Sequence, residues 1–226
     1  MIVLGFDTAT PATVVAVVDD GGPGAGVERR HEPVPGARPG HASQLLVLAR
    51  QALAKLELTF ADVDRIAVGV GPGGFTGLRI GVATARALAQ AAGAELVGVG
   101  TLEALARTNA GARGQGVLAV VDARRGEVFA GGWRGGERVL APVAVAPSRI
   151  GELVEPGWLS VGDGAVRFRD DLERAGCVVP AADSHHHLVS ALVICRLARD
   201  LPPVLDLDLV PDYLREPDAV RPKRPS

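Results

Sequence analysis

Long apolar runs, paired cysteines and an excess of one charge are all missing from this sequence of 226 residues. No stretch approaches the ~20 consecutive apolar residues that a membrane-spanning helix needs, and the opening MIVLGFD lacks the basic start of a signal peptide. The two cysteines, Cys177 and Cys195, are too few for a disulfide framework and lack the C-x-x-C spacing of a zinc site. We therefore expect a cytoplasmic protein that makes no contact with a membrane.

Features of a nucleic-acid-binding surface or a catalytic centre are equally scarce. A formal net charge of −2 and an aromatic content of 4% leave little for phosphate steering or base stacking. No Gly-Lys-Ser/Thr follows a glycine loop, no serine lies in a nucleophile elbow, and no H-x-x-x-H pair occurs. The three consecutive histidines 185–187 would point to different sides of a helix, so we predict no metal site there. No catalytic residue and no metal ligand is therefore predicted.

The most distinctive stretch, residues 64–92, is rich in glycine and alanine. It predicts a buried strand over 66–70, a glycine-rich turn over 71–77 and a helix over 78–92. The string 69–74 satisfies G-x-G-x-x-G, but it contains a proline and no acidic residue closes the next strand, so a dinucleotide site is not predicted. A turn with so few side chains would let its backbone approach a ligand or another chain closely.

Two similar hairpins open the two halves of the chain. The first has an apolar strand ending in Asp7, a turn with Thr8 and Thr10, and a β-branched strand. The second runs from VLAVV through Asp122 and ARRG to EVFAGGW. Such strand-end carboxylates could hold a metal-bound phosphate or form ordinary turns. The repeated plan indicates an internal duplication, with an N-terminal α/β lobe over 1–110, a smaller α/β lobe over 111–210 and a tail over 211–226.

Helical patterns account for much of the remaining chain. The helix expected over 42–57 has more apolar positions than one sheet-facing stripe requires. It could therefore be buried on two sides inside its own lobe or meet a partner. The helix over 78–92 has small residues on one face and a narrow polar stripe on the other. Further helices are predicted over 102–109, with Thr101 as its N-cap, and over 166–175 and 185–199.

Five motifs spread over both halves carry a resemblance to a known family. They are LGFDTAT, GVGPGGFTGLRIGVATARALA, VVDARRGEVFAG, VGDG and PDYLREPDA, of which GPGGFTGLRIG is the most specific. The chain resembles the TsaB (YeaZ) family. That resemblance implies a two-lobed actin-like (ASKHA) ATPase-type α/β fold with ribonuclease-H-like lobes. The fold is expected to be degenerate, because Asp7 lacks a following glycine and Arg124 and Arg125 occupy the second hairpin tip.

The resemblance also implies a function. TsaB-like chains are non-catalytic subunits that bind and activate the TsaD-type threonylcarbamoyltransferase in the t6A37 modification of tRNA. The expected partners are a TsaD paralogue, the TsaE ATPase and a second copy of the chain, with tRNA reached only indirectly. ATP or ADP would be held, if at all, in the complex. The alternative from another class is an independent small ATPase or kinase that uses Asp7 or Asp122.

The same resemblance gives two sets of candidate residues. Weak nucleotide-binding candidates from the two hairpins and the VGDG turn are Asp7, Thr8, Thr10, Asp122, Gly162 and Gly164. Candidates for a helical partner interface are Leu45, Leu48, Ala49, Ala52 and Leu56 from the first helix, with Ala83, Arg86 and Gln90 from the second.

Overall fold

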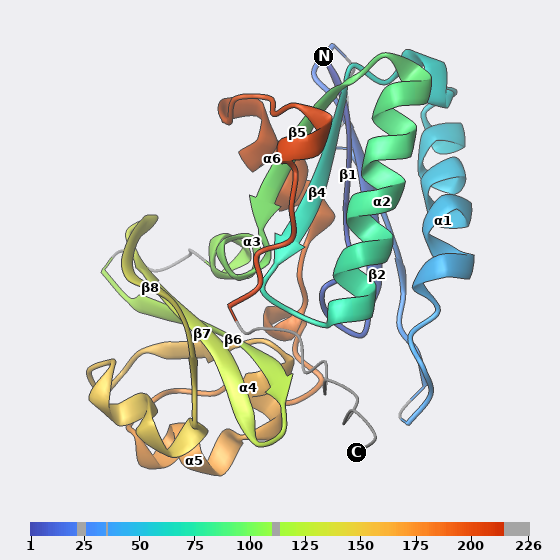
Figure 1. Ribbon diagram of the computed structural model, residues 1–226. Coiled ribbons are helices and arrows are strands. Elements are labelled where there is room, and N and C mark those ends of the chain that lie inside the picture. The colour runs from blue at the N-terminus through green and yellow to red at the C-terminus, as the bar shows by residue number, and fades with distance from the viewer. Residues whose placement is uncertain (22–25, 35, 110–113, 215–226) are drawn as a thin grey trace, which may run out of the picture.

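Two β-sheets, each built around an antiparallel hairpin with a parallel third strand, organise the fold (Figure 1). The computed structural model describes residues 1–21, 26–34, 36–109 and 114–214. Within these residues no helix is long and apolar enough to cross a membrane. The shared plan of the two sheets agrees with the duplication that the sequence indicates.

The first sheet contains β1 (Ile2–Asp7), β2 (Thr13–Asp19), β3 (Val27–His31), β4 (Arg65–Gly71) and β5 (Glu95–Gly100), in the order β3-β2-β1-β4-β5. β1 pairs antiparallel with β2 and parallel with β4, so the first hairpin lies at the centre of the sheet. These central strands are rich in valine because both of their faces are covered. The more polar β3 lies at the edge, as its composition predicts.

Helices cover both faces of the first sheet (Figure 1). On one face α1 (His41–Lys55) and α2 (Phe75–Ala92) pack against Leu4 and Phe6 of β1. On the other, α3 (Thr101–Thr108) and α6 (Ala191–Asp200) pack against Val3, because successive strand residues point to opposite faces. Although α6 follows the second half of the chain, it returns to the first sheet.

The second sheet contains β6 (Gly116–Arg124), β7 (Glu127–Arg134), β8 (Glu137–Val145) and β9 (Leu159–Val161), in the order β8-β7-β6-β9. Its own apolar cluster packs under the short helical segments η2 (Pro147–Glu152), α4 (Asp163–Arg167) and α5 (Arg169–Arg174). The expected boundary between the lobes, at residues 110 and 111, lies outside the described residues. The residue bounds of the two lobes therefore stay a prediction.

Several helix predictions need correction. The helix expected over 185–199 is a single 3₁₀ turn, η3 (His185–His187), followed by extended residues and then by α6. Histidine, valine and serine favour helix weakly, and extended Ser190 instead begins α6. Thr101 is the first residue of α3 and does not cap it, because its hydroxyl bonds elsewhere. Residues 166–175 lie in two short helices, α4 and α5, and α2 begins at Phe75.

A C-terminal strap, residues 201–214, runs back along the first sheet (Figure 1). The Val204 N–H donates to Leu96 O of β5 at 2.8 Å, and the Asp212 N–H donates to Val70 O of β4 at 2.7 Å. Leu209 is buried between these points. The strap includes the short η4 (Asp206–Asp208). The start of the predicted tail is thus packed onto the first lobe, and residues 215–226 lie outside the described residues.

Candidate functional site

The glycine-rich loop, residues 71–77, packs closely against the turn of the first hairpin of the same chain, a contact that we call the glycine joint. A Cβ atom at Gly77 would lie 1.9 Å from the carbonyl oxygen of Thr8, and one at Gly73 would lie 2.4 Å from that of Ala9. The Thr8 hydroxyl donates to Gly77 O at 2.7 Å, and the Gly74 N–H donates to Ala9 O at 2.7 Å. The glycines therefore let α2 approach the first hairpin turn at a distance that side chains would forbid.

Asp7, the first nucleotide-binding candidate, is enclosed by this packing. Its side chain is 0% exposed, and Gly69 has room for no Cβ because the Asp7 carboxylate occupies that space. The Thr101 hydroxyl and the Ala9 N–H each donate to it at 2.7 Å. Burial raises the pKa of Asp7, and the hydrogen bonds from Thr101 and Ala9 partly oppose that shift. Asp7 thus ties the end of β1 to the start of α3.

We expect Asp7→Asn to stabilise the protein at neutral pH. Because the folded-state pKa lies above the ordinary value of 3.8, the contribution of Asp7 to stability is complete below that value and declines as pH rises through the folded pKa. Asparagine keeps an acceptor for the Ala9 N–H without a buried charge. Urea unfolding at about pH 7.5 should give a gain of roughly 1–3 kcal/mol, shrinking toward about pH 4. A variant less stable than the wild type at both pH values would contradict this prediction and would show that the Thr101 hydroxyl and the Ala9 N–H each need a carboxyl oxygen as acceptor.

At the second hairpin, Asp122 is held by its own neighbours. Its Oδ1 atom accepts from the Arg124 N–H at 2.9 Å. Its Oδ2 atom accepts from the guanidinium groups of Arg124 at 3.1 Å and Arg167 at 3.2 Å. Arg124 and Arg125 have positive φ angles of 64° and 55°, which place two long side chains at the hairpin tip. The carboxylate therefore accepts three hydrogen bonds from its own neighbours.

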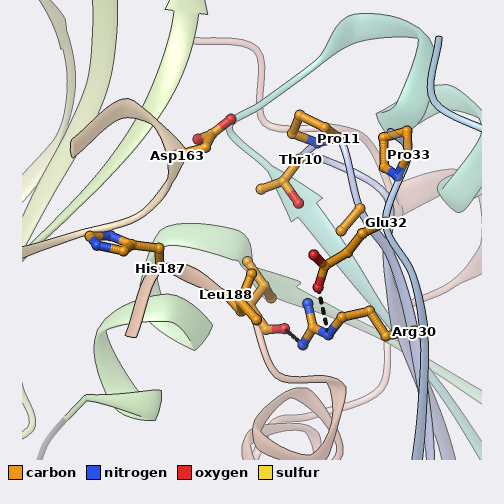
Figure 2. Close-up of a pocket in the computed structure, with 10 residues that line it drawn as sticks. Thr10, Pro11, Arg30, Glu32, Pro33, Asp163, His187 and Leu188 are labelled. Atoms are coloured by element: carbon orange, nitrogen blue, oxygen red, sulfur yellow. Dashed lines mark hydrogen bonds and ion pairs between the residues drawn. The ribbon is translucent and has the colours of Figure 1, made fainter. Parts of the chain in front are cut away.

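A cavity of about 180 Å³ lies between the two lobes (Figure 2). Asp163, at the start of α4, faces Thr10 of the first hairpin turn across it. Burial raises the pKa of Asp163, which also accepts from the Asp122 N–H at 3.2 Å. The lining residues are Thr10, Pro11, Ala12, Arg30, Glu32, Pro33, Asp163, His187, Leu188 and Val189.

Of the predicted nucleotide-binding residues, only Thr10 lines this cavity. Thr8 is fully buried, and its hydroxyl is used by Gly77. Gly162 donates its N–H to His187, and Gly164 lies under the backbone of β6. The residues missed by sequence reasoning are Arg30, Glu32, Asp163 and His187. Asp163 had a sequence signal, because it stands between the two glycines of the VGDG turn, whereas Arg30 and Glu32 had none.

The site does not fit the nucleotide that ATPases of this fold class would bind. Pockets for small molecules commonly measure about 300–1,000 Å³, which exceeds the 180 Å³ found here. Asp7 and Thr8 are buried and fully bonded, so neither can meet a phosphate in this conformation. The nucleotide contact of these two residues stays a prediction, and in this conformation packing against α2 and α3 occupies both side chains.

The predicted interface stripe on α1 is also corrected. Four of its five residues pack in the core against the first sheet, namely Leu45, Leu48, Ala49 and Ala52. The fifth, Leu56, is partly buried beside them. The exposed large hydrophobic side chains of α1 are instead Leu46 and Val47, each 46% exposed. The apolar arc of the helix thus divides into a stripe that faces the chain's own sheet and a shorter one that faces outward.

The predicted residues of α2 lie at the surface. Ala83 and Gln90 are exposed, and Arg86 is half-buried. Arg86 donates to Leu209 O of the C-terminal strap at 2.9 Å and lies 3.5 Å from Asp206. At the other end of α2, the Phe75 ring lies 5.4 Å from that of Tyr213. The outer face of α2 is therefore flanked by α1 on one side and by the strap on the other (Figure 1).

Known proteins share the sequence of this chain over most of its length. A family model described as "TsaD: tRNA N6-adenosine threonylcarbamoyltransferase" matches residues 34–157. An uncharacterized protein of Mycobacterium tuberculosis is 38% identical over 223 residues, which cover 96% of this chain and 93% of that one. The tRNA threonylcarbamoyladenosine biosynthesis protein TsaB of Escherichia coli is 34% identical over 193 residues, or 79% of this chain and 78% of that protein.

A solved structure gives the same result for the fold. YeaZ from Pseudomonas aeruginosa matches with a TM-score of 0.75 and 28% sequence identity, over 94% of this chain and 99% of that one. This likeness confirms the two-lobed actin-like (ASKHA) fold that the motifs imply. With the glycine joint, the paired hairpins and these relatives in agreement, the chain belongs to the TsaB (YeaZ) family.

Proposed function

We propose that this chain is the non-catalytic partner subunit of a TsaD-type tRNA N6-adenosine threonylcarbamoyltransferase, which it binds and activates in the t6A37 modification of tRNA. An ATPase of the TsaE type joins the complex, and the chain pairs with itself when the enzyme is absent. The observation that carries this proposal is membership of a family whose Escherichia coli protein is named for tRNA threonylcarbamoyladenosine biosynthesis.

The state of the two hairpin carboxylates supports a non-catalytic role. Asp7 is buried and bonded to Thr101, and Asp122 is held by Arg124 and Arg167. A kinase or ATPase needs a carboxylate that can reach a metal ion or a reacting hydroxyl. Neither side chain is available for that task in this conformation, so nothing favours the alternative of an independent ATPase.

The outer faces of α1 and α2 are the proposed contact with the enzyme and with a second copy. Leu46 and Val47 are large aliphatic side chains that stand exposed on a helix whose other leucines, Leu45, Leu48 and Leu53, are buried. On α2 the neighbouring surface includes Ala83 and Gln90, whose modest size suits close packing of helices. A bundle of two helices from each chain would bury this surface. Arg86 would lie at its border, beside the strap.

Activation follows if docking favours one state of the enzyme. The enzyme's active form must bind α1 and α2 more tightly than its inactive form does, and the difference in affinity sets the shift in population. This chain then supplies a rigid surface and no reacting group.

Val47→Arg should abolish the heterocomplex while the chain stays folded. A guanidinium at the centre of a helical interface would be desolvated without a partner, which should weaken binding by at least about 100-fold. Light scattering on a size-exclusion column, with the chain mixed with the TsaD paralogue of the same organism, measures this loss. Val139→Arg is the matched control, because Val139 is exposed on β8 of the other lobe.

One result would overturn the partner assignment, and another would overturn only the proposed interface. If the wild-type chain and the paralogue elute separately at micromolar concentrations, the partner assignment fails. If they form a complex that Val47→Arg and Val139→Arg weaken equally, the assignment stands and the interface lies elsewhere.

A further inference from the structure

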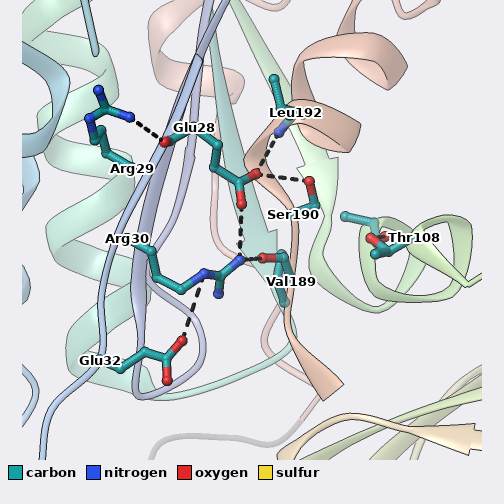
Figure 3. A network of polar contacts seen from close by, with 9 residues as sticks. Glu28, Arg29, Arg30, Glu32, Thr108, Val189, Ser190 and Leu192 are labelled. Carbon is teal, nitrogen blue, oxygen red and sulfur yellow. Dashed lines mark hydrogen bonds and ion pairs between the residues drawn. The ribbon is translucent and has the colours of Figure 1, made fainter. Parts of the chain in front are cut away.

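Two late segments of the chain attach to the first sheet at its two edge strands, β3 and β5, and they differ in what they present to solvent. At the β3 edge, charged side chains fasten the residues that lead into α6 (Figure 3). Glu28 Oε2 accepts from the Ser190 hydroxyl at 2.8 Å and from the Leu192 N–H at 3.1 Å. Arg30 donates to Val189 O at 2.6 Å. The charges at this edge are therefore used within the chain.

At the β5 edge, the C-terminal strap is attached mainly through its backbone. Its hydrogen bonds to β5 and β4 hold it near either end. Between them, the Arg86 guanidinium of α2 donates to Leu209 O at 2.9 Å, and the Leu209 side chain is buried. At the beginning of the strap, the Arg65 guanidinium donates to Leu201 O at 3.2 Å. The backbone of the strap is thus fixed along its length in the free chain.

The outward side of the strap exposes apolar side chains. Residues 201–208 are all exposed, and among them Leu205 is 76% and Leu207 is 81% exposed. The strap holds nearly half of the large hydrophobic side chains that are exposed in the described part of the chain. Single exposed apolar residues are normal on a protein surface, whereas a contiguous group marks a surface that meets another molecule.

The same surface is acidic. Residues 201–214 include Asp206, Asp208 and Asp212 but no lysine or arginine. Asp206 lies 3.5 Å from Arg86. Asp208 is exposed and forms no ion pair with any residue that the structure describes. Because an acidic partner would be repelled, these charges favour a partner whose apolar surface is bordered by lysine or arginine.

The strap is continuous with the outer face of α2, the proposed contact with the enzyme. Phe75 at the start of α2 and Tyr213 of the strap are both exposed, and their rings lie 5.4 Å apart. Arg79 lies over the Phe75 ring at 3.9 Å from its centroid, and its Nε donates to the Tyr213 hydroxyl at 3.3 Å. Tyrosine and arginine are enriched among the residues that dominate binding energy. One partner surface can therefore cover α2 and the strap together.

We propose that the strap is a second docking element for the TsaD-type enzyme, an inference that rests on the proposed function. Leu205 and Leu207 insert into an apolar cleft of the enzyme, and lysine or arginine at the border of that cleft faces Asp208. The strap loses little conformational freedom on docking, because its backbone is already fixed. The helices α1 and α2 supply the apolar bundle, and the strap adds orientation and electrostatic steering.

Surface plasmon resonance, with the full chain passed over the immobilised TsaD paralogue of the same organism, tests the apolar part of the proposal. Leu207→Asn should raise the dissociation constant at least about tenfold, because a side chain buried in the complex becomes polar. The midpoint of its urea unfolding should match that of the wild type, since Leu207 is exposed in the free chain. Val139→Asn is the matched control, because Val139 is exposed on β8 of the other lobe, and it should bind as the wild type does.

Asp208→Lys tests the charge separately. At about 50 mM NaCl its association rate constant should be at least about fivefold below that of the wild type, because a cation now faces the basic border. The difference should shrink at about 500 mM NaCl, where salt screens exposed charges. Wild-type association at both salt concentrations would overturn the basic border of the cleft.

Failure of the strap proposal and failure of the proposed function give different results. If the wild-type chain does not bind the paralogue at micromolar concentrations, both are wrong. If Val47→Arg prevents binding and Leu207→Asn binds as the wild type does, the partner assignment stands and the strap proposal is wrong. The strap proposal is also wrong if Leu207→Asn weakens only the pairing of the chain with itself, or only the addition of the TsaE-type ATPase.

Discussion

Ala52→Arg should prevent the chain from folding. Ala52 is 0% exposed and lies on α1 against the first sheet, in the same apolar cluster as Leu4, Phe6 and Val15. Arginine would bring an unpaired charge and six extra side-chain heavy atoms into a closed core. The expected loss, roughly 5 kcal/mol or more, equals much of the stability of an ordinary domain. Circular dichroism and urea unfolding of the purified chain measure it.

Val47→Arg, five residues earlier on the same helix, is the matched comparison. Val47 is nearly half exposed, so the arginine can extend into water, and the free energy of unfolding should stay within about 0.5 kcal/mol of the wild type. If Ala52→Arg folds normally and only loses its partner, the burial found here is wrong for the protein in solution. If Val47→Arg unfolds the chain, the face of α1 that carries Val47, and not the face that carries Ala52, packs on the sheet.

The sequence of α1 could not decide between these two faces. Its apolar residues at 45, 48, 49 and 52 follow the spacing of a single helix stripe, and such a stripe is equally suited to a sheet or to a partner. Leu46 and Val47 lie outside that stripe and were the informative residues. Their meaning depends on which side of the helix the sheet occupies, which the sequence of the helix alone does not state.

The strands and the order of the elements could be predicted, because each depends on residues close together in the chain. The β-branched runs gave β1, β2 and β4, and the paired hairpins gave the duplicated plan. The environment of Asp7 depends on Thr101, 94 positions away. A carboxylate at a strand end can face solvent or be enclosed, and only that long-range contact decides the case. The cavity joins four such distant segments, which is why only Thr10 was foreseen.

The three histidines show how one pattern can be interpreted correctly and still remain unexplained. Their spacing excludes ligation from a helix, but it gives no hint that they form a 3₁₀ turn at the crossing between lobes. The rings of His186 and His187 contact Asn109 and Gly162, which lie 77 and 25 positions away in the chain. Polar side chains in such joints are selected by partners far along the chain.

A single methyl group is expected to have a large effect at Gly77. Glycine within a helix is normally about 1 kcal/mol less favourable than alanine, so Gly→Ala in α2 should stabilise the chain on propensity alone. At Gly77 the sign should reverse, because the new Cβ atom would lie 1.9 Å from Thr8 O and would break the hydrogen bond from the Thr8 hydroxyl. Overpacking and the lost bond together should lower the free energy of unfolding by at least about 2 kcal/mol.

Gly151→Ala provides the control for this reversal. Gly151 also lies in a helical turn, and a Cβ atom there would have its nearest neighbour at 3.5 Å, an ordinary contact. Urea unfolding should show Gly151→Ala at or slightly above wild-type stability and Gly77→Ala well below it. Equal stability of the two variants would mean that α2 can move away from the first hairpin at little cost. In that case the glycines of this loop would serve contact with another molecule, and not the close packing of α2 against the Asp7 turn.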